Sequence, residues 1–581
     1  MIKLDGSLPA QPSPSQGPLT RALTLPGVRN CLAKAAHDPR IPGVVLRVGQ
    51  LSSGWATLQE LREAIHSFQN ESDGNKFSIA TLEQASEKEM YIASACEELY
   101  AISDSSTISL TGLSVQGTFL RGALDKAGIE PQVQRLGEYK SAGDQFLRKD
   151  MSDAQREQLA ALLDDIYYTF IRGIASSRNK TEDDVHSLID RGVQDVQHLK
   201  HEGWIDGVVY RDEIRDLLKP RTGDSRSEAP QVSYSKYVQA PAAIAKRPKQ
   251  DKKDKNEKET PSLGVLHLSG AIVGGSSRQG SNGTIAAEDT IDKVRKLRNN
   301  SNIKAVVVRI TSPGGDAFAS ELMWRELQLL GRQKPVVASM LDTAASGGYF
   351  LSMACSSIFA HPLTLTGSIG VVLAQFNFGE LYSKIGYSKT FISRGRYAEV
   401  TADNRSFTDE EEQFQQQQAL RLYQHFRNLA ARCRGQAPEE METRARGRVW
   451  SGKRAIEEGL VDQLGSLEDA IKHCKTLIGY EREDDVNILD FGQLAPDPST
   501  LLASGNASVP KSGWMGSVFR QVLLPLLSWW HRMQTCTPTN ALGDVRLEHE
   551  DDIDVAGVSL SSDRTATGRI GFSSRDEDLF T

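Results

Sequence analysis

The segment IPGVVLRV (residues 41–48) recurs as IKAVVVRI (residues 303–310), 262 positions further along the chain. Three more segments recur in the same order: residues 95–101 as 354–360, residues 202–206 as 458–462, and residues 152–155 as 408–411, with shifts of 259, 256 and 256 positions. Because four matches keep one order and nearly one spacing, we infer a tandem duplication of one domain. The last pair also predicts two helices that each begin with a capping box.

Strands and helices alternate within each half. The second half places strands at 264–273, 305–310 and 335–341, and helices at 286–300, 320–330 and 408–432. Continuous runs of Val and Ile are typical of strands buried on both faces of a sheet, and strand–helix–strand alternation predicts parallel βαβ units. A long helix at 152–175 in the first half matches 408–432. We therefore expect an α/β fold with two tandem domains, each a largely parallel sheet flanked by helices.

Charge divides the chain into segments. Residues 246–259 carry seven basic and four acidic groups and no apolar side chain, so they cannot bury enough surface to fold. From residue 534 onward, ten acidic residues accompany four arginines, which is typical of a solubilising tail; an acidic docking tail is the alternative. We expect an N-terminal repeat at 1–218, a charged linker at 219–262, a C-terminal repeat at 263–480 and a low-complexity extension at 481–581.

Composition excludes several classes of protein. With 39% hydrophobic and 25% charged residues and a mean hydropathy of −0.39, the chain is neither wholly disordered nor a polytopic membrane protein. A net charge of −7 argues against a nucleic-acid partner. Six scattered cysteines without a C-x-x-C pair indicate neither a disulfide framework nor a zinc site, so we expect no metal and no cofactor. No cleavable signal peptide is visible in the first residues.

Two glycine-rich segments follow predicted strands. In TSPGGD (311–316), Gly314 and Gly315 let backbone N–H groups approach a ligand, as in an oxyanion hole; the alternative is a tight turn that needs positive φ. In TAASGGY (343–349), Ser346 lies between Ala and Gly, and its uncrowded hydroxyl suits a nucleophile. The alternative is a serine that caps the following helix.

A nucleophilic serine needs a base, and two candidates stand out. His361 is the histidine nearest in sequence, but His361-Pro362 is typical of the start of a loop, and no Ser–His–Asp order can be argued. A lysine base must be neutral, which requires burial that lowers its pKa. Lys140 differs from the other lysines because small residues follow it, although an exposed loop lysine is the ordinary alternative.

Five motifs together carry a family resemblance. They are GEYKSA (137–142), SPGGDAFASE (312–321), TAASGGYFLS (343–352), LTLTGSIGVV (363–372) and GRVWSGKRAIEEGLVDQLG (447–465). With the repeat, they cover about residues 1–480 in the family's order. The chain resembles the signal peptide peptidase A (protease IV) family in its long, tandem-duplicated form. The resemblance implies a serine peptidase on a fold shared with Clp protease and crotonases.

The resemblance also implies site residues and a mechanism. Ser346 would be the nucleophile, Lys140 the general base, and Ser368 the hydroxyl that orients the lysine. The residues of the oxyanion hole would be Gly314 and Gly315 at its border and Gly347 as a second N–H donor. Neutral Lys140 would take the proton of Ser346 as the hydroxyl attacks a peptide carbonyl.

The repeat tests this assignment. A shift of 259 positions places Glu87 opposite Ser346, so the first half would lack a nucleophile. A shift of 258 positions places Ala398 opposite Lys140, so the second half would lack a base. One composite active site in each chain is the economical interpretation.

Further implications concern partners and location. The family's substrates are hydrophobic, signal-peptide-like peptides, and its long members assemble as homotetramers. The Trp-bracketed apolar segment 514–532 is too short to span a bilayer and indicates peripheral membrane contact, with packing onto protein as the alternative. We expect the chloroplast thylakoid if the source is a photosynthetic eukaryote, and otherwise the outer face of the bacterial cytoplasmic membrane. The family's N-terminal anchor is not visible; an anchorless form and a truncated start both explain this.

Two other functions compete with the peptidase. A crotonase-like acyl-CoA enzyme would share the fold and the glycine oxyanion hole, but it would not need the AASGG serine paired with a lysine. A non-catalytic scaffold would keep the fold for assembly alone. Labelling of Ser346 by a fluorophosphonate would separate the acyl-CoA enzyme from a serine peptidase, because crotonases form no seryl adduct. The scaffold would instead show a substrate-free groove and no turnover.

Overall fold

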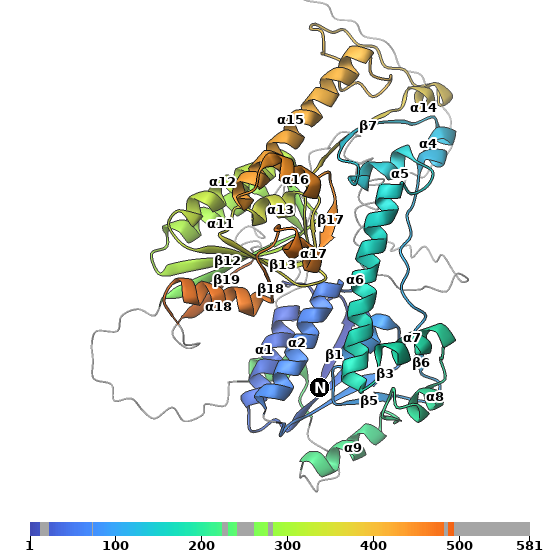
Figure 1. Cartoon of the computed structure of the whole chain (residues 1–581), viewed down its shortest axis with the longest axis vertical. Helices are drawn as coiled ribbons and strands as arrows, with labels where there is room; N and C mark the ends of the chain where they lie inside the picture. The colour runs from blue at the N-terminus through green and yellow to red at the C-terminus, as the bar shows by residue number, and fades with distance from the viewer. Residues whose placement is uncertain are drawn as a thin grey trace, which may run out of the picture. The chain divides into compact units, whose positions relative to one another are not determined.

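A parallel sheet forms the centre of the first half of the computed structural model (Figure 1). Its strand order is β1-β2-β3-β5-β8, and every neighbouring pair runs parallel. The strands are β1 (Ile2–Gly6), β2 (Gly43–Leu51), β3 (Phe77–Leu82), β5 (Glu98–Ala101) and β8 (Gly207–Val208). The structure describes residues 1–11, 23–72, 74–222, 231–240, 261–276, 283–480 and 486–492.

A second sheet forms the centre of the other half. Its main order is β17-β15-β13-β12-β9-β19, and β14 pairs with β13 and β18 beside that path. The strands are β9 (Ser262–Ser269), β12 (Ile303–Ser312), β13 (Val336–Ala345), β14 (Ser357–Ala360), β15 (Leu365–Gly367), β17 (Val449–Ser451), β18 (Gln463–Leu464) and β19 (Asn487–Phe491). All pairs are parallel except β15 with β17. The predicted strand 264–273 is divided, since β10 (Ala271–Val273) lies outside this sheet.

The duplication predicted from the sequence is visible in the topology. The series β1-β2-β3-β5-β8 recurs as β9-β12-β13-β14-β18. The register recurs as well, because Arg47 pairs with Thr81 in the first sheet and Arg309 with Ser339 in the second. The expected α/β fold with two largely parallel sheets is therefore confirmed.

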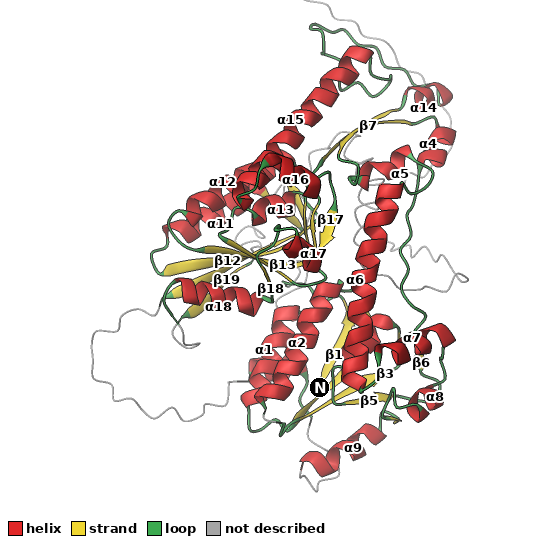
Figure 2. Ribbon diagram, viewed as in Figure 1, coloured by secondary structure: helices red, strands yellow, loops and turns green. Residues whose placement is uncertain are grey.

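Helices cover both faces of each sheet (Figure 2). In the second half, Val306, Val308 and Ile310 of β12 pack with α11 (Ala287–Asn299), α12 (Ala317–Gly331) and α13 (Gly347–Ser352). The intervening Ala305 and Val307 pack with α18 (Leu467–Leu477) on the other face. In the first half, α1 (Leu25–His37) and α2 (Trp55–Glu71) cover one face, and α9 (Glu213–Thr222) covers the other. Burial on both faces explains the continuous apolar strand sequences.

Two helices of 26 residues occupy equivalent places in the repeat, α6 (Asp153–Arg178) and α15 (Asp409–Arg434). Thr408 and Glu411 form the predicted capping box at the start of α15. At α6, Ser152 Oγ accepts from Gln155 N at 3.2 Å, but no reciprocal side-chain bond completes a box. Gln155 Oε1 makes no hydrogen bond with the described residues, so this helix start has one half of the predicted motif.

One pair of strands joins the two halves. Strand β7 (Glu130–Leu136) pairs antiparallel with β16 (Val371–Asn377), from Leu136 opposite Val371 to Glu130 opposite Asn377.

The remaining elements are β4 (Gln84–Ala85), α3 (Glu87–Ala93), β6 (Thr107–Ile108), α4 (Arg121–Ala127), η1 (Ser141–Gly143), α5 (Asp144–Leu147), α7 (Glu182–Arg191), α8 (Val196–His201), α10 (Tyr234–Gln239), β11 (Thr284–Ala286), α14 (Gly379–Lys384), α16 (Pro438–Arg444) and α17 (Gly452–Glu457).

Two short elements lie in the segments assigned to the linker and the extension. Tyr237 of α10 is buried and donates to Asp38 at 3.0 Å, and β19 adds a parallel strand to β9. The charged run 246–259, the Trp-bracketed segment 514–532 and the acidic tail lie outside the described residues. None of the described helices combines the length and the apolar character needed to cross a membrane.

Candidate active site

Ser346 lies at a strained turn between strand β13 and helix α13. Its φ of 54° and ψ of −117° fall in a region that residues with a side chain rarely adopt. The turn is held because Ser346 N donates to Gly367 O at 2.9 Å. Such a turn presents the hydroxyl clear of the strand and the helix, as a nucleophile elbow does. The side chain is half-buried and does not cap α13, which decides against the capping alternative.

The two glycines after β12 lie against this turn. A Cβ atom at residue 314 would lie 2.6 Å from Gly347 N and 2.8 Å from Ser346 Cβ. A Cβ atom at residue 315 would lie 2.1 Å from Ile272 O. Glycine at 314 therefore allows the loop to approach the serine, and glycine at 315 allows it to approach β10, which explains both residues of the SPGG motif.

Backbone donors converge near the serine. Gly347 is the first residue of α13, where an amide N–H has no acceptor within its own helix. In the described part of the chain, neither Gly347 N–H nor Gly315 N–H donates a hydrogen bond. Fixed, unused N–H groups of this kind can stabilise a developing oxyanion.

Lys140 reaches the serine from the other half of the chain. Its Nζ lies 3.3 Å from Ser346 Oγ, 2.9 Å from Ser368 Oγ and 2.9 Å from Ser368 O. The side chain is 8% exposed, and burial lowers the pKa of the amine from its usual value to about 7. A substantial fraction of Lys140 is therefore neutral near neutral pH.

The contacts of Lys140 suit the neutral amine. A neutral amine has two N–H bonds and one lone pair. The two oxygen atoms of Ser368 can accept the two N–H groups, which leaves the lone pair to accept the proton of Ser346 Oγ. Ser368 itself has a φ of 52° and is anchored because its N donates to Arg448 O at 2.7 Å.

Several residues that the sequence analysis did not single out hold Lys140 in place. A Cβ atom at residue 447 would lie 2.4 Å from Lys140 Cβ, so Gly447 makes room for the lysine. Gln158 Nε2 donates to Tyr139 O at 3.1 Å, and Gln158 Oε1 accepts from Val449 N at 3.2 Å. Gly447 begins the GRVWSG motif, whereas Gln158 carries no local signal because it acts on residues distant in the sequence.

His361 belongs to a different cluster. It is fully buried, and its Nε2 lies 2.9 Å from Glu60 Oε2 rather than near Ser346. The Glu60 carboxylate also pairs with Arg309 and with Arg29, and these neighbours hold its pKa well below its usual range against the opposing effect of burial. Glu60 comes from α2 in the first half, and Arg309 and His361 come from the second, so this cluster fastens the halves together.

The structure corrects the repeat alignment at the nucleophile. Ser86, not Glu87, is equivalent to Ser346, because Ser86 precedes α3 as Ser346 precedes α13. Ser86 has an extended backbone (φ −118°), and its hydroxyl donates to Glu89 at 2.6 Å. Lys88, where the second half has glycine, is buried and donates to Ser53 O at 2.8 Å. The first half thus keeps a serine in place, but within a capping box.

Metal ligands are not gathered at this site. In the part of the chain that the structure describes, no three His, Cys, Asp or Glu side chains converge as metal ligands would. The groups that meet are a hydroxyl, a buried amine and backbone N–H donors, which together can perform acyl transfer.

Comparison with known proteins places these features in context. The model of peptidase family S49 matches residues 70–223 and 328–481. A serine protease SPPA, chloroplastic, from Arabidopsis thaliana is 40% identical over 492 residues, which cover 84% of this chain and 70% of that protein. Protease 4 from Haemophilus influenzae is 28% identical and covers 85% of this chain and 79% of its own. A ClpP1 mutant from Listeria monocytogenes aligns over 36% of this chain and 94% of its own, with 17% identity and a TM-score of 0.24.

Proposed function

The chain belongs to peptidase family S49 and is a serine endopeptidase; from this premise we propose that Ser346 is its nucleophile and Lys140 its general base. The observation that carries the proposal is the 3.3 Å approach of a buried Lys140 amine to the hydroxyl of a strained serine. Family membership decides against the acyl-CoA enzyme. The proximity of Lys140 to Ser346 supports catalysis over a non-catalytic scaffold.

Acylation begins with proton transfer. Neutral Lys140 accepts the proton of Ser346 Oγ while the oxygen attacks the carbonyl carbon of the scissile peptide bond. The carbonyl oxygen becomes an oxyanion, which accepts from the N–H groups of Gly315 and Gly347. Each such donor contributes about 2.7–4 kcal/mol to transition-state stabilisation in comparable sites.

The second proton transfer completes the cycle. Protonated Lys140 donates to the leaving amine as the C–N bond breaks, and an acyl-enzyme ester on Ser346 remains. A water molecule then gives its proton to Lys140 and attacks the ester. Collapse of this second intermediate returns the proton to Ser346 Oγ and releases the carboxylic acid.

We infer that the peptides cleaved are hydrophobic, as signal peptides are. Phe318 lies three residues after Gly315, at the start of α12, and is 71% exposed. An exposed aromatic ring one helical turn from the oxyanion loop offers apolar surface to a substrate side chain. A relative in Enterococcus faecium carries the name putative signal peptide peptidase SppA.

We further propose that copies of the chain assemble head to tail as a homotetramer. Within one chain, α2 of the first half meets the second sheet through Glu60 and Arg309, and α6 meets α17 through Asp165 and Arg454, at 2.7 Å. Because the domain is duplicated, each of these four surfaces has an equivalent on the opposite half. Those equivalent surfaces would contact a second copy of the chain.

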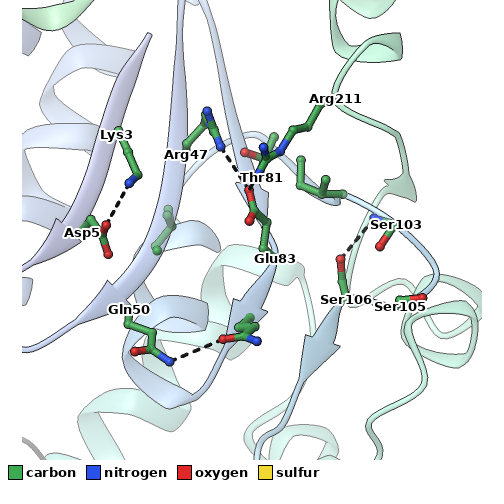
Figure 3. Close-up of a pocket in the computed structure, with 14 residues that line it drawn as sticks. Lys3, Asp5, Arg47, Gln50, Thr81, Glu83, Ser103, Ser105, Ser106 and Arg211 are labelled. Atoms are coloured by element: carbon green, nitrogen blue, oxygen red, sulfur yellow. Dashed lines mark hydrogen bonds and ion pairs between the residues drawn. The ribbon is translucent and has the colours of Figure 1, made fainter.

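The equivalent positions lie on accessible surface. The position of Arg309 is taken by Arg47, which lines an open pocket of about 630 Å³ and pairs with Glu83 at 3.1 Å (Figure 3). A shift of 262 positions, from the start of α2 to the start of α12, places Leu322 at the position of Glu60, and this leucine is 41% exposed.

The long helices supply a charged contact between copies. Within the chain Asp165 also accepts from Ser451 Oγ, at 2.7 Å. The shift of 256 positions that relates the start of α6 to the start of α15 places His198 at the position of Arg454. It places Arg421 at the position of Asp165 and Asp195 at the position of Ser451. Both side chains are exposed and opposite in charge. A heterologous contact of this kind repeats from copy to copy and can close into a ring.

The names of the relatives support a proposal for location. We propose a chloroplast location with peripheral membrane contact if the source is photosynthetic, since the Arabidopsis relative is called chloroplastic, and the outer face of the cytoplasmic membrane if it is bacterial. The segment proposed for membrane contact is 514–532, outside the described residues. Flotation of the full chain with thylakoid-lipid vesicles tests the contact, and recovery only in the unbound fraction would contradict it.

A direct assay tests the catalytic assignment. Ser346→Ala and Lys140→Ala are compared with the parent on a fluorogenic hydrophobic peptide, and a fluorophosphonate probe reports the modified residue by peptide mapping. We expect both variants to lose turnover and the label to map to Ser346. Turnover by Ser346→Ala, or a label on another residue, would overturn the assignment.

A further inference from the structure

The loop that borders the oxyanion hole is held by a buried hydroxyl. Gly314 N donates to Ser312 Oγ at 3.1 Å, and Ser312 is completely buried at the end of β12. On the next peptide group, Gly314 O accepts from Ile272 N of β10 at 2.9 Å, and Asp316 N donates to Ile272 O at 3.0 Å. Three successive peptide groups of the loop are thus fixed, one by Ser312 and two by Ile272.

These bonds decide which amides face the reaction. Because the N–H of Gly314 is used by Ser312, it cannot donate to an oxyanion at the same time. Gly314 C=O and Gly315 N–H belong to the same peptide group, and in a trans peptide these two bonds point in opposite directions. Because Gly314 O points toward β10, the Gly315 N–H points away from it. The donors left for the oxyanion are therefore Gly315 N–H and Gly347 N–H.

Ser312 contacts both segments that hold these donors, the glycine loop after β12 and the start of α13. Its hydroxyl fixes the peptide group that precedes Gly314, and its backbone lies beneath the start of α13, since a Cβ atom at residue 348 would lie 2.6 Å from Ser312 O. Gly314 packs closely against Gly347, because a Cβ atom added at residue 314 would lie 2.6 Å from Gly347 N. A small rotation of the Gly314 peptide would therefore be transmitted to Gly347.

We propose that Ser312 is a positioning residue for the oxyanion hole: its hydroxyl turns the Gly314 peptide away so that Gly315 N–H faces the reacting carbonyl. The inference rests on the proposed function of Ser346 and goes beyond it. Without the hydroxyl, Gly314 N–H is buried without an acceptor, an arrangement that costs enough for the peptide to rotate toward a new partner. The Lys140 amine is not involved, so its titration is unaffected.

The test compares Ser312→Ala with Ser78→Ala in the full chain. Ser78 is a matched control, since it is completely buried in the first half and its hydroxyl accepts from Glu97 N at 3.0 Å. For Ser312→Ala we expect kcat to fall about tenfold with KM unchanged. The inhibition constant of a peptide aldehyde, which forms a tetrahedral adduct with the serine, should rise by the same factor. The pH midpoint of kcat/KM should stay where the parent has it.

Other outcomes overturn the inference. It fails if Ser312→Ala keeps the parental kcat, if kcat falls without weaker aldehyde binding, or if Ser78→Ala produces the same changes. Ser312→Cys covers the case in which the alanine variant does not fold, because a thiol fills the space but is a weak acceptor, and the same loss of kcat is expected. Turnover by Ser346→Ala would instead contradict the proposed function, so the two failures are distinguishable.

Discussion

Lys140 Nζ lies 3.3 Å from Ser346 Oγ although 206 positions of sequence separate the two residues. The approach depends on β7 and β16, whose antiparallel pairing brings the residues just before Lys140 to the residues that follow Ser368. The active site proposed here is consequently a property of the join between the halves. Changes that alter this join should alter catalysis, and the following predictions use that relationship.

The pH dependence of activity should report Lys140. Burial lowers the pKa of this amine to about 7, and the base acts only when neutral. We therefore expect kcat/KM to rise with pH through a midpoint near 7 and to reach a plateau above it. The measurement is kcat/KM on the fluorogenic peptide from about pH 5.5 to about pH 9. A midpoint near the usual lysine value would contradict the assignment.

The same shift predicts how stability depends on pH. A lysine whose folded pKa is lowered penalises folding most below that pKa, and the penalty disappears as the pH rises to the unfolded value of about 10.4. Lys140→Met removes the amine but keeps the apolar stem. Its melting temperature should exceed that of the parent near neutral pH, and the gain should shrink toward pH 10. A gain that does not depend on pH would count against the shift.

Ser368→Ala should weaken the base without removing it. The hydroxyl lies 2.9 Å from Lys140 Nζ and stabilises the charged amine, so its loss should lower the lysine pKa further. We expect the pH midpoint to move downward and kcat to fall about tenfold, because the lone pair is less well oriented. A titration of kcat checks both. An upward shift of the midpoint would contradict the proposed role.

Gly447→Ala should displace the lysine. The new Cβ would lie 2.4 Å from Lys140 Cβ, and it would also impose a left-handed backbone (φ +76°) on alanine. We expect kcat to fall at least tenfold, because a displaced Lys140 amine would no longer accept the proton of Ser346 efficiently. Gly192→Ala is the control for backbone strain alone, since Gly192 has φ +59° and no atom within 4 Å of a Cβ. Equal losses in the two variants would show that crowding of Lys140 is not the cause.

Asp342→Ala should loosen the contact between the halves. Asp342 lies on β13, and its carboxylate accepts from Thr57 N at 2.8 Å and from Thr57 Oγ1 at 2.6 Å. The Asp342 carboxylate thereby caps the N-terminus of α2. The N-cap residue of that helix is Gly54, which has no side chain that could accept such a bond. We expect a loss of about 1–2 kcal/mol in the free energy of unfolding, measured by urea denaturation. Thr57→Val, which keeps the backbone bond, should cost less; the reverse order would contradict the capping role.

Arg421→Glu should break the proposed contact between copies. The exposed Arg421 would then face Asp195 with a like charge, so we expect smaller assemblies by light scattering after gel filtration. Adding Asp195→Arg to the same chain exchanges the two charges and should restore the tetramer. Lys296→Glu on α11 serves as a control for an exposed charge reversal. A tetramer that survives Arg421→Glu, or a parent that is monomeric, would contradict the head-to-tail model.

The elements of the fold were predictable because they depend on near neighbours in the sequence. The helices at 286–300 and 320–330 and the strands at 305–310 and 335–341 match α11, α12, β12 and β13 closely. The equivalence of Ser86 and Ser346 was not predicted, because α3 and α13 begin at a shift of 260 positions, one more than the Cys96 and Cys355 match that set the alignment.

Supporting residues of the site escaped prediction for a physical reason. Gln158 and Gly447 act on Lys140 and its neighbours across 17 to 307 positions, and no local pattern encodes such contacts. Ser312 stands in a motif that was recognised, but the bond from Gly314 N–H depends on backbone torsion angles. Motifs identify which residues are candidates, whereas distances between them arise only on folding.

By itself, the sequence determined the duplication, because four short segments recur in one order. It also determined the α/β architecture and the candidates Ser346 and Lys140, because periodicity and motifs are read from residues close together in the chain. The tertiary structure alone decided that Lys140 is buried beside Ser346 and that His361 instead pairs with Glu60. A pKa near 7 follows from desolvation by surrounding residues that are remote in sequence. Local sequence sets local conformation, but the environment of a charge is set by the whole fold.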